Sequence, residues 1–236
     1  SMRGLICWDL DETLGYFRPI AGEIMAELEA SQRGFFGRLL AKFSSKPPEA
    51  EGPPLRLREG IEAALTRLGQ AGFVQVVTTG SFELYANRGL ERCGLRGHFA
   101  AVYGRERVWE GRGKVYAQVL EDFKVSPEQV VIVGDSFERD RSSDFPGIVM
   151  ICQPEGLDET AATIPPVIEA LSSEAGFAAT FDRWVTETPF DGLVRRVVLE
   201  EAEVAVERWG NYRRPDSLTP VLSALKLPSP APANES

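Results

Sequence analysis

Two aspartates stand one residue apart where an apolar stretch near the start of the sequence ends. Residues 5–8 read LICW, and Asp9 and Asp11 follow within DLDET. Burying a carboxylate is costly unless a hydrogen bond or a cation compensates for the lost water. The pattern therefore indicates one of two arrangements: a strand that simply ends in water, or carboxylates that gather around a cation.

A third aspartate, Asp135, follows another apolar stretch, VVIV at 130–133. In an open parallel α/β sheet, ligands bind outside the carboxyl ends of the strands. If both stretches are strands of such a sheet, Asp9, Asp11 and Asp135 meet at one edge. Two or three carboxylates together with water are a typical Mg²⁺ site. This combination favours the cation over the solvated turn.

Two neighbouring threonines end the stretch FVQVVTT at 73–79 and compete for a place at the same edge. Successive strand residues point to opposite faces, so only one of Thr78 and Thr79 can face the site. We predict Thr79, because Gly80 follows it and allows a close approach of the backbone to an anion. Ser81 is expected to cap the next helix, whose N-terminus favours an anion.

A lysine, Lys114, follows Gly-Arg-Gly and is predicted to open a helix. A cation is slightly unfavourable there, because the N-terminal end of the helix dipole is positive. The placement therefore favours an anionic partner for Lys114. The preceding segment, YGRERVWEGRG at 103–113, either contacts a remote part of a substrate through its arginines and aromatic rings or forms a solvated loop.

The elements that must position these residues alternate between short apolar runs and helical patterns. The runs after residues 5–8 lie at 73–79, 100–103, 130–133 and 148–152. Each is β-branched and bounded by turn residues, as buried parallel strands are. Apolar residues at helical spacing lie between the runs: Ile61, Leu65 and Leu68, then Phe82, Tyr85 and Leu90, then Tyr116, Leu120 and Phe123. The alternation predicts a Rossmann-like three-layer α/β fold around a parallel sheet.

Two stretches fall outside this alternation. Residues 15–56 combine an apolar stripe with the breaker-rich SSKPPEAEGPP, which predicts a small helical insert near the site. The stripe, expected to pack within the chain, is Phe35, Phe36, Leu39, Leu40 and Phe43. Residues 176–236 are expected to form a helical extension, with a helix over 191–209 and a loose Pro-rich tail. Residues 1–175, insert included, are expected to form the core domain.

The composition narrows the classes of function. A formal net charge of −9 disfavours nucleic acid and anionic membranes as partners, and no apolar run reaches transmembrane length. The three cysteines are widely spaced, which predicts a reducing, cytoplasmic location and gives no zinc framework. His98 is the single histidine, which disfavours His-based triads and His-rich metal sites. The oligomeric state is left open.

The order and spacing of these residues resemble the haloacid dehalogenase (HAD) superfamily over residues 4–172. The shared features are DLDET after a strand, Thr-Gly after the next strand, an isolated lysine, and GDxxxxD after a later strand. DLDETL and TGSFELYA also resemble the phosphatases of the RNA polymerase II C-terminal domain. That branch carries D-N-S where this chain has Gly134-Asp135-Ser136. The resemblance implies a HAD-like core and a Mg²⁺-dependent phosphohydrolase.

The resemblance also implies roles in the reaction. Asp9 would be the nucleophile that forms an aspartyl phosphate, and Asp11 the general acid/base. Thr79 and Gly80 would bind the phosphoryl group, and Lys114 would hold both that group and the nucleophile. An acyl phosphate divides one difficult step into two, and the departing oxygen needs a proton. Asp11 lies two residues after Asp9 and therefore on the same side of an extended chain.

The same resemblance implies a metal site. Mg²⁺ would bind the Asp9 side chain, the Asp11 carbonyl and the Asp135 side chain. Asp140 and Ser136 would contact these ligands without binding the metal. The substrate would be a phosphorylated small molecule or a phosphorylated macromolecule. Two alternatives remain: a phosphotransferase or mutase of the same family, and a catalytically idle domain used for binding.

Overall fold

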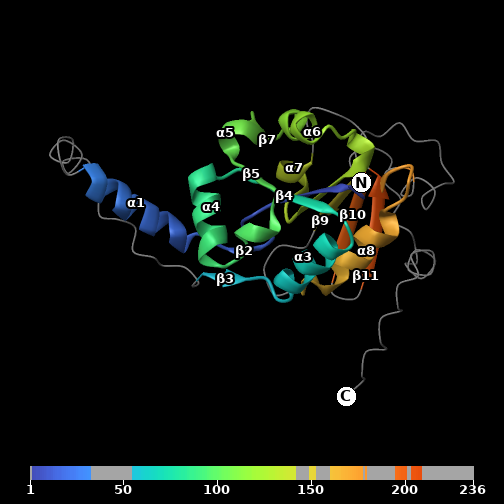
Figure 1. Cartoon of the computed structure of the whole chain (residues 1–236), viewed down its shortest axis with the longest axis horizontal. Helices are drawn as coiled ribbons and strands as arrows, with labels where there is room; N and C mark the ends of the chain where they lie inside the picture. Colours follow the sequence, from blue (N-terminus) through green and yellow to red (C-terminus); the bar gives the residue numbers. More distant parts are fainter. Residues whose placement is uncertain are drawn as a thin grey trace, which may run out of the picture.

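A mostly parallel β-sheet forms the centre of the protein. The computed structural model describes residues 2–32, 55–141, 149–152, 160–177, 179, 195–200 and 203–208. Its main sheet has seven strands in the order β11-β10-β9-β8-β1-β4-β5 (Figure 1). These strands are β1 (Leu5–Trp8), β4 (Val74–Thr78), β5 (Ala101–Tyr103), β8 (Val130–Gly134), β9 (Val149–Cys152), β10 (Arg195–Glu200) and β11 (Glu203–Arg208). All neighbours pair in parallel except β10 and β11. The predicted parallel α/β sheet is confirmed.

Helices cover both faces of this sheet. Figure 1 shows α5 (Arg105–Val108) and α6 (Ala117–Phe123) on one side and α3 (Ile61–Gln70) and α8 (Ile164–Leu171) on the other. Side chains alternate along β1: Ile6 and Trp8 belong to the apolar core with α3 and α8, whereas Leu5 and Cys7 belong to the core with α6. The three layers follow from strands that are apolar on both faces.

Most of the predicted helices form where the apolar spacing places them. In α3, the buried side chains are Ile61, Ala64, Leu65 and Leu68. In α4 (Glu83–Arg92), Ala86 and Leu90 are buried, but Phe82 precedes the helix and is 59% exposed, so its predicted place on the buried face is wrong. The short helical elements are α7 (Phe137–Asp140), η1 (Arg96–His98), η2 (Pro127–Gln129) and η3 (Ala161–Thr163). Within the described residues, no helix combines the length and the apolarity needed to cross a bilayer.

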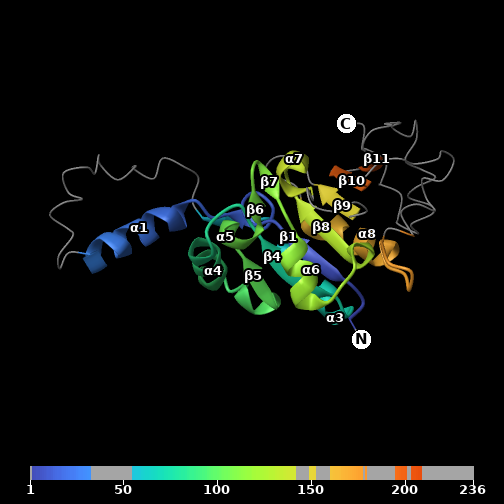
Figure 2. The ribbon, with the colours of Figure 1, turned by 90° about the horizontal axis from the view of Figure 1, so that it is seen from above.

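The insert begins and ends on a small two-stranded sheet. β2 (Gly15–Tyr16) and β3 (Arg56–Leu57) pair antiparallel, which brings the two ends of the insert together. Between them, α1 (Pro19–Gln32) confirms a helix in the first part of the insert, and Figures 1 and 2 show it extending away from the main sheet. The predicted stripe over residues 35–43 lies outside the described residues, so its packing stays a prediction.

The helix predicted over residues 191–209 is wrong. Within this stretch, residues 195–200 form β10, which pairs in parallel with β9, and residues 203–208 form β11, which is antiparallel to β10. This part of the sequence, RRVVLEEAEVAVER, fits either structure: helix-forming Glu and Ala alternate with β-branched Val. The edge of β9 has unpaired backbone N–H and C=O groups, and pairing with them favours a strand over a helix. The helical interpretation of the C-terminal extension therefore fails here. The Pro-rich tail and the domain boundary near residue 175 stay predictions.

Candidate active site

The carboxyl ends of three central strands meet at one cavity. Trp8 pairs in register with Val77 of β4 and Val133 of β8, so the residues that follow these strands lie side by side. The backbone N–H of Asp9 donates a 2.8 Å hydrogen bond to the Val133 carbonyl. Asp9, Asp11, Thr79, Gly80, Lys114, Asp135, Ser136 and Asp140 all line the cavity, whose volume is about 500 Å³. The predicted site residues therefore gather in one place.

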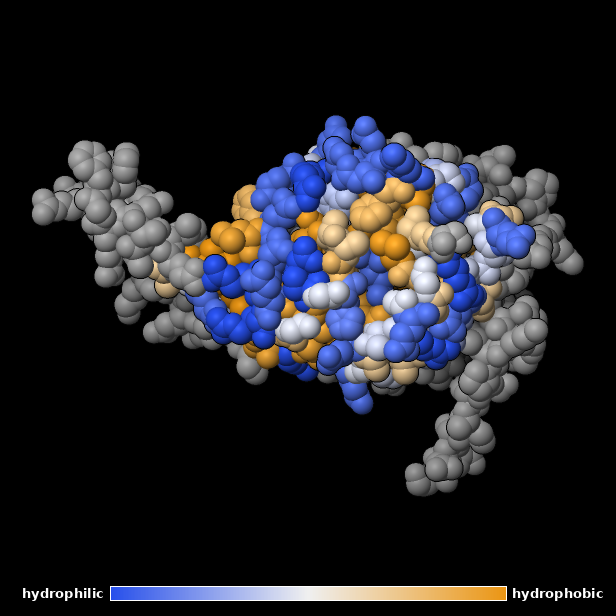
Figure 3. Space-filling view, viewed as in Figure 1, coloured by the Kyte–Doolittle hydropathy of each residue, from blue (hydrophilic) through white to orange (hydrophobic). Residues whose placement is uncertain are grey.

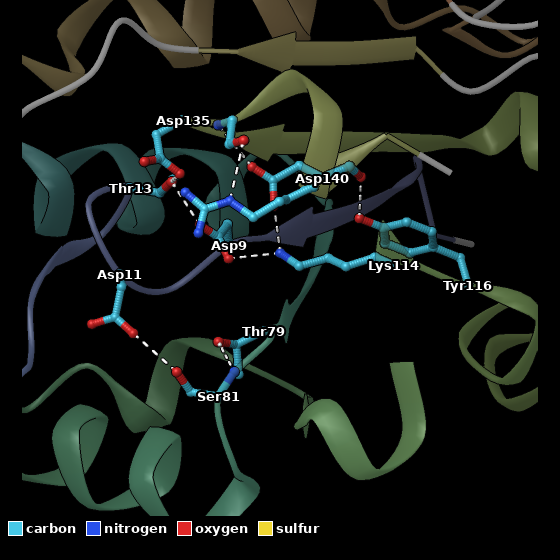
Figure 4. A network of polar contacts seen from close by, with 11 residues as sticks. Asp9, Asp11, Thr13, Thr79, Ser81, Lys114, Tyr116, Asp135 and Asp140 are labelled. Atoms are coloured by element: carbon cyan, nitrogen blue, oxygen red, sulfur yellow. Dashed lines mark hydrogen bonds and ion pairs between the residues drawn. The ribbon is translucent and has the colours of Figure 1, made fainter. Parts of the chain in front are cut away.

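A buried lysine joins two of the aspartates. Lys114 Nζ lies 2.6 Å from Asp9 Oδ1 and 2.6 Å from Asp140 Oδ1 (Figure 4). Lys114 is only 1% exposed. Its burial opposes the charged form, but Asp140 and Asp9 outweigh that effect and raise the pKa of Lys114 above its ordinary value. Lys114 is therefore a fixed cation that holds both carboxylates.

The position of Lys114 in the chain differs from the prediction. It ends β7 (Gly113–Lys114), which pairs with β6 (Trp109–Glu110) in a small hairpin, and helix α6 begins only at Ala117. The expected placement of Lys114 at the start of a helix is wrong. This cation binds Asp9, which follows β1, and Asp140, which ends α7.

Three carboxylates lie close enough to share one cation. One oxygen each of Asp9, Asp135 and Asp140 falls within 4.8 Å of the others. Thr13 Oγ1 lies 3.3 Å from Asp9 Oδ2 and 3.5 Å from Asp135 Oδ1, so these two carboxylates turn toward the same point. Burial, followed by repulsion from Asp9 and Asp140, raises the pKa of Asp135 to about 8. Lys114 brings one positive charge to three carboxylates, and this shortage, together with an all-oxygen donor set, fits a divalent cation such as Mg²⁺.

Gly134 and the short helix α7 determine where the Asp140 carboxylate lies. A Cβ built on Gly134 would lie 2.1 Å from Asp140 Oδ2, so a larger residue there would displace the carboxylate. The backbone N–H of Ser136 donates a 3.0 Å hydrogen bond to Asp140 Oδ2, and Tyr116 Oη donates one of 2.5 Å to the Asp140 carbonyl. Burial raises the pKa of Asp140 to about 6, and repulsion from Asp9 adds to this effect.

Asp11 lies across the cavity, where two hydroxyls hold it. Tyr85 Oη donates a 2.9 Å hydrogen bond to Oδ1 of Asp11, and Ser81 Oγ donates one of 3.1 Å to Oδ2. Burial raises the pKa of Asp11, and the hydrogen bond from Tyr85 partly opposes the rise. The predicted capping role of Ser81 is wrong: Phe82 is the N-cap residue of α4 and makes no side-chain capping bond.

The loop that carries both aspartates is held by an arginine from the far end of the insert. Arg58 is 1% exposed, and its guanidinium donates hydrogen bonds to the carbonyls of Thr13 at 2.7 Å and Glu12 at 2.5 Å. Glu12 has φ +65°, a left-handed conformation that is costly for a residue with a side chain. Arg58, Thr13 and Tyr85 were not predicted as site residues from the sequence. Tyr85 could have been found, because it belongs to TGSFELYA, a stretch that resembles other phosphatases.

The threonine that faces the cavity is Thr79, as predicted from the glycine that follows it. Thr79 lines the cavity, whereas Thr78 is fully buried and does not. Next to it, a Cβ on Gly80 would lie 2.9 Å from the Trp109 ring, so this glycine lets the indole pack on the loop. His98 lies in η1 and does not line the cavity.

Comparison with known proteins gives one family match and several similar solved structures. Residues 49–142 match the family model of haloacid dehalogenase-like hydrolases. This segment contains Thr79, Lys114, Asp135 and Asp140, while Asp9 and Asp11 precede it. A search of curated proteins found no match.

Several solved structures are similar to part of this chain. A predicted phosphoglycolate phosphatase from Haemophilus somnus 129pt is 19% identical, with a TM-score of 0.47, over 66% of this chain and 87% of that one. CbbY from Rhodobacter sphaeroides, solved with phosphate, is 20% identical, with a TM-score of 0.44, over 66% and 88%. A putative β-phosphoglucomutase from Thermotoga maritima is 16% identical, with a TM-score of 0.43, over 68% and 89%. The sequence motifs and the family match agree: residues 49–142 of this chain are similar to haloacid dehalogenase-like hydrolases.

Proposed function

We propose that the protein is a Mg²⁺-dependent phosphohydrolase that cleaves a phosphate monoester through an aspartyl phosphate on Asp9. The observation that carries this proposal is the fixed Asp9 carboxylate in the cavity, bound by Lys114 at 2.6 Å and turned toward Asp135. A carboxylate held at the end of a strand can attack without first reorganising. Intact side chains at every predicted position support an enzyme over an idle binding domain.

In the first step, an Asp9 oxygen attacks phosphorus and the bond from phosphorus to the alcohol oxygen breaks. Asp11 gives its proton to that departing oxygen. Its raised pKa, caused first by burial, favours the protonated form that this step requires. Lys114, Thr79 and the backbone at Gly80 bind the transferred phosphoryl group as charge shifts onto its oxygens.

In the second step, water attacks the phosphorus of the aspartyl phosphate. Asp11 takes a proton from the water, the bond from phosphorus to Asp9 breaks, and inorganic phosphate leaves with Asp9 restored. A bound Mg²⁺ would neutralise the repulsion between the Asp9 carboxylate and the phosphate dianion. The Asp9 and Asp135 side chains and the Asp11 carbonyl would hold that ion, while Asp140 keeps Lys114 in place.

The test is hydrolysis of phenyl phosphate by the full chain with Mg²⁺ and with the metal removed by a chelator. We expect turnover only with Mg²⁺, none in Asp9→Asn, and a loss of about 10²–10⁴-fold in Asp11→Asn. Thermal unfolding of each variant controls for folding. Turnover that survives Asp9→Asn would rule out the covalent mechanism. Release of phosphate to water, with no transfer to an added alcohol, separates a hydrolase from a phosphotransferase.

A further inference from the structure

We infer that the same cavity binds a second anionic group, carried by the alcohol part of the substrate, on Arg105 between the rings of Phe82 and Trp109. This inference rests on the proposed phosphohydrolase function and defines the substrate class. The substrates would be phosphate monoesters whose alcohol carries a carboxylate or a second phosphate.

The three side chains form one wall of the cavity. The guanidinium carbon of Arg105 lies 5.6 Å from the ring centre of Phe82 and 5.9 Å from that of Trp109, and all three residues line the cavity. These distances are in the range of cation–π contacts. The wall is also fixed to the phosphate-binding loop, because the Arg105 backbone N–H donates a 2.8 Å hydrogen bond to the Ser81 carbonyl. The arginine is therefore held near the place where the phosphoryl group would bind.

The arginines of the cavity differ in their partners from four arginines elsewhere in the described residues. Within the described residues, no carboxylate pairs with the three arginines that line the cavity, Arg18, Arg105 and Arg139. Four arginines away from the cavity lining each pair with a glutamate, namely Arg67 with Glu169, Arg92 with Glu23, Arg107 with Glu83 and Arg141 with Glu138. Five carboxylates line the same cavity, but none of them pairs with Arg105, so the positive charge of this side chain is available to a ligand.

The position of Arg105 between two rings indicates an anion rather than a neutral aromatic group. The guanidinium lies over the faces of Phe82 and Trp109, so these faces are already in use. Its N–H groups remain available, since no acceptor among the described residues binds them. A guanidinium presents these donors in a plane that matches the two oxygens of a carboxylate or a phosphate. The flanking rings limit the side-chain rotamers, so that less entropy is lost on binding.

A matched set of aryl phosphates tests this inference. The substrates are 3- and 4-carboxyphenyl phosphate, the corresponding neutral carboxamides, and 1,3- and 1,4-phenylene bisphosphate. We expect at least one carboxyphenyl phosphate or phenylene bisphosphate to have a higher kcat/KM than the carboxamide with the same ring positions substituted. The expected ratio is about 10- to 100-fold, the range for hydrogen bonds to charged groups. A preference for the carboxylates assigns the second group as a carboxylate, and a preference for the bisphosphates assigns a phosphate.

Two arginine variants complete the experiment. Arg105→Met should abolish the preference for the anionic substrates while phenyl phosphate is still hydrolysed with Mg²⁺. Arg112→Met is the matched control, because Arg112 lies in the same segment, is exposed and does not line the cavity. Equal kcat/KM values for the charged and neutral substrates, or a preference that persists in Arg105→Met, would overturn the inference. Absence of Mg²⁺-dependent phenyl phosphate turnover in the wild type would instead overturn the proposed function, and this inference with it.

Discussion

The phenolic hydroxyl of Tyr85 donates a 2.9 Å hydrogen bond to Oδ1 of Asp11. Ser81 Oγ donates a 3.1 Å hydrogen bond to the other oxygen, so the carboxyl group is bound at both oxygens by one residue just before α4 and one in its first turn. A hydroxyl can donate to a carboxylate and accept from a carboxylic acid. The pair can therefore hold Asp11 in one orientation in both protonation states of the proposed reaction.

The first prediction concerns this orientation. Tyr85→Phe should slow hydrolysis of an alkyl phosphate, whose poor leaving group needs a proton, by about 10-fold or more. It should affect p-nitrophenyl phosphate much less, because that leaving group departs without protonation. The measurement is kcat for both substrates in wild type and variant. An equal loss on both substrates would show that Tyr85 does not act through Asp11.

The second prediction concerns Lys114. Lys114→Met leaves the buried Asp9 and Asp140 carboxylates without their cation, which should cost about 3–5 kcal/mol in the free energy of unfolding. Turnover should fall to background, because the proposed phosphate ligand is gone. Urea unfolding without metal measures the first effect. Lys124→Met, at an exposed position, is the matched control and should leave both quantities nearly unchanged. A stable Lys114→Met protein would contradict the structural role.

The third prediction concerns Mg²⁺ and pH. Folding raises the pKa of Asp135 from 3.8 to about 8 in the metal-free protein, first through burial. The folded form therefore holds a proton that the unfolded form has lost, and the contribution of this group to stability falls as the pH rises from about 4 to about 8. Mg²⁺ must displace that proton in order to bind. The increase in Tm on adding Mg²⁺ should consequently be larger near pH 8 than near pH 6.

The variant Asp135→Asn tests the assignment of this pH effect. An amide has no proton to release, and it is a weaker ligand for Mg²⁺ than a carboxylate. We expect a small shift in Tm that is the same at both pH values. A shift in Asp135→Asn that still grows with pH would place the titrating group elsewhere.

The fourth prediction concerns Gly134. Gly134→Ala places a methyl group 2.1 Å from Asp140 Oδ2 and should force this carboxylate away from Lys114. We expect a loss of about 1–3 kcal/mol in unfolding free energy, together with reduced turnover. Gly97→Ala is the control, since a Cβ there meets no atom within 4 Å. Wild-type stability and activity in Gly134→Ala would show that Asp140 can move without consequence.

The sequence by itself determined β1, β4, β5, β8 and β9 of the main sheet and the set of residues at its edge. Short β-branched runs bounded by turns have few alternatives to buried strands, and the carboxyl ends of parallel strands meet at one edge. Asp9, Thr79 and Asp135 could therefore be placed together from local patterns alone. The alternation of side chains along a strand indicated that only one of Thr78 and Thr79 faces the site, and the glycine after Thr79 favoured Thr79.

The tertiary structure decided the contacts between residues far apart in the sequence. It also decided the secondary structure of segments whose sequence is compatible with both a helix and a strand. Tyr85 binds Asp11 across 74 residues, and Lys114 binds Asp9 across 105, separations that no local spacing encodes. The strand pairing of residues 195–208 also depends on a partner, because their mixture of Glu, Ala and Val is compatible with a helix until β9 offers an edge. The spacing of apolar residues specifies a helix or strand when one face of that segment must be buried. The pairing of strands depends instead on which strand edges the rest of the fold leaves unpaired.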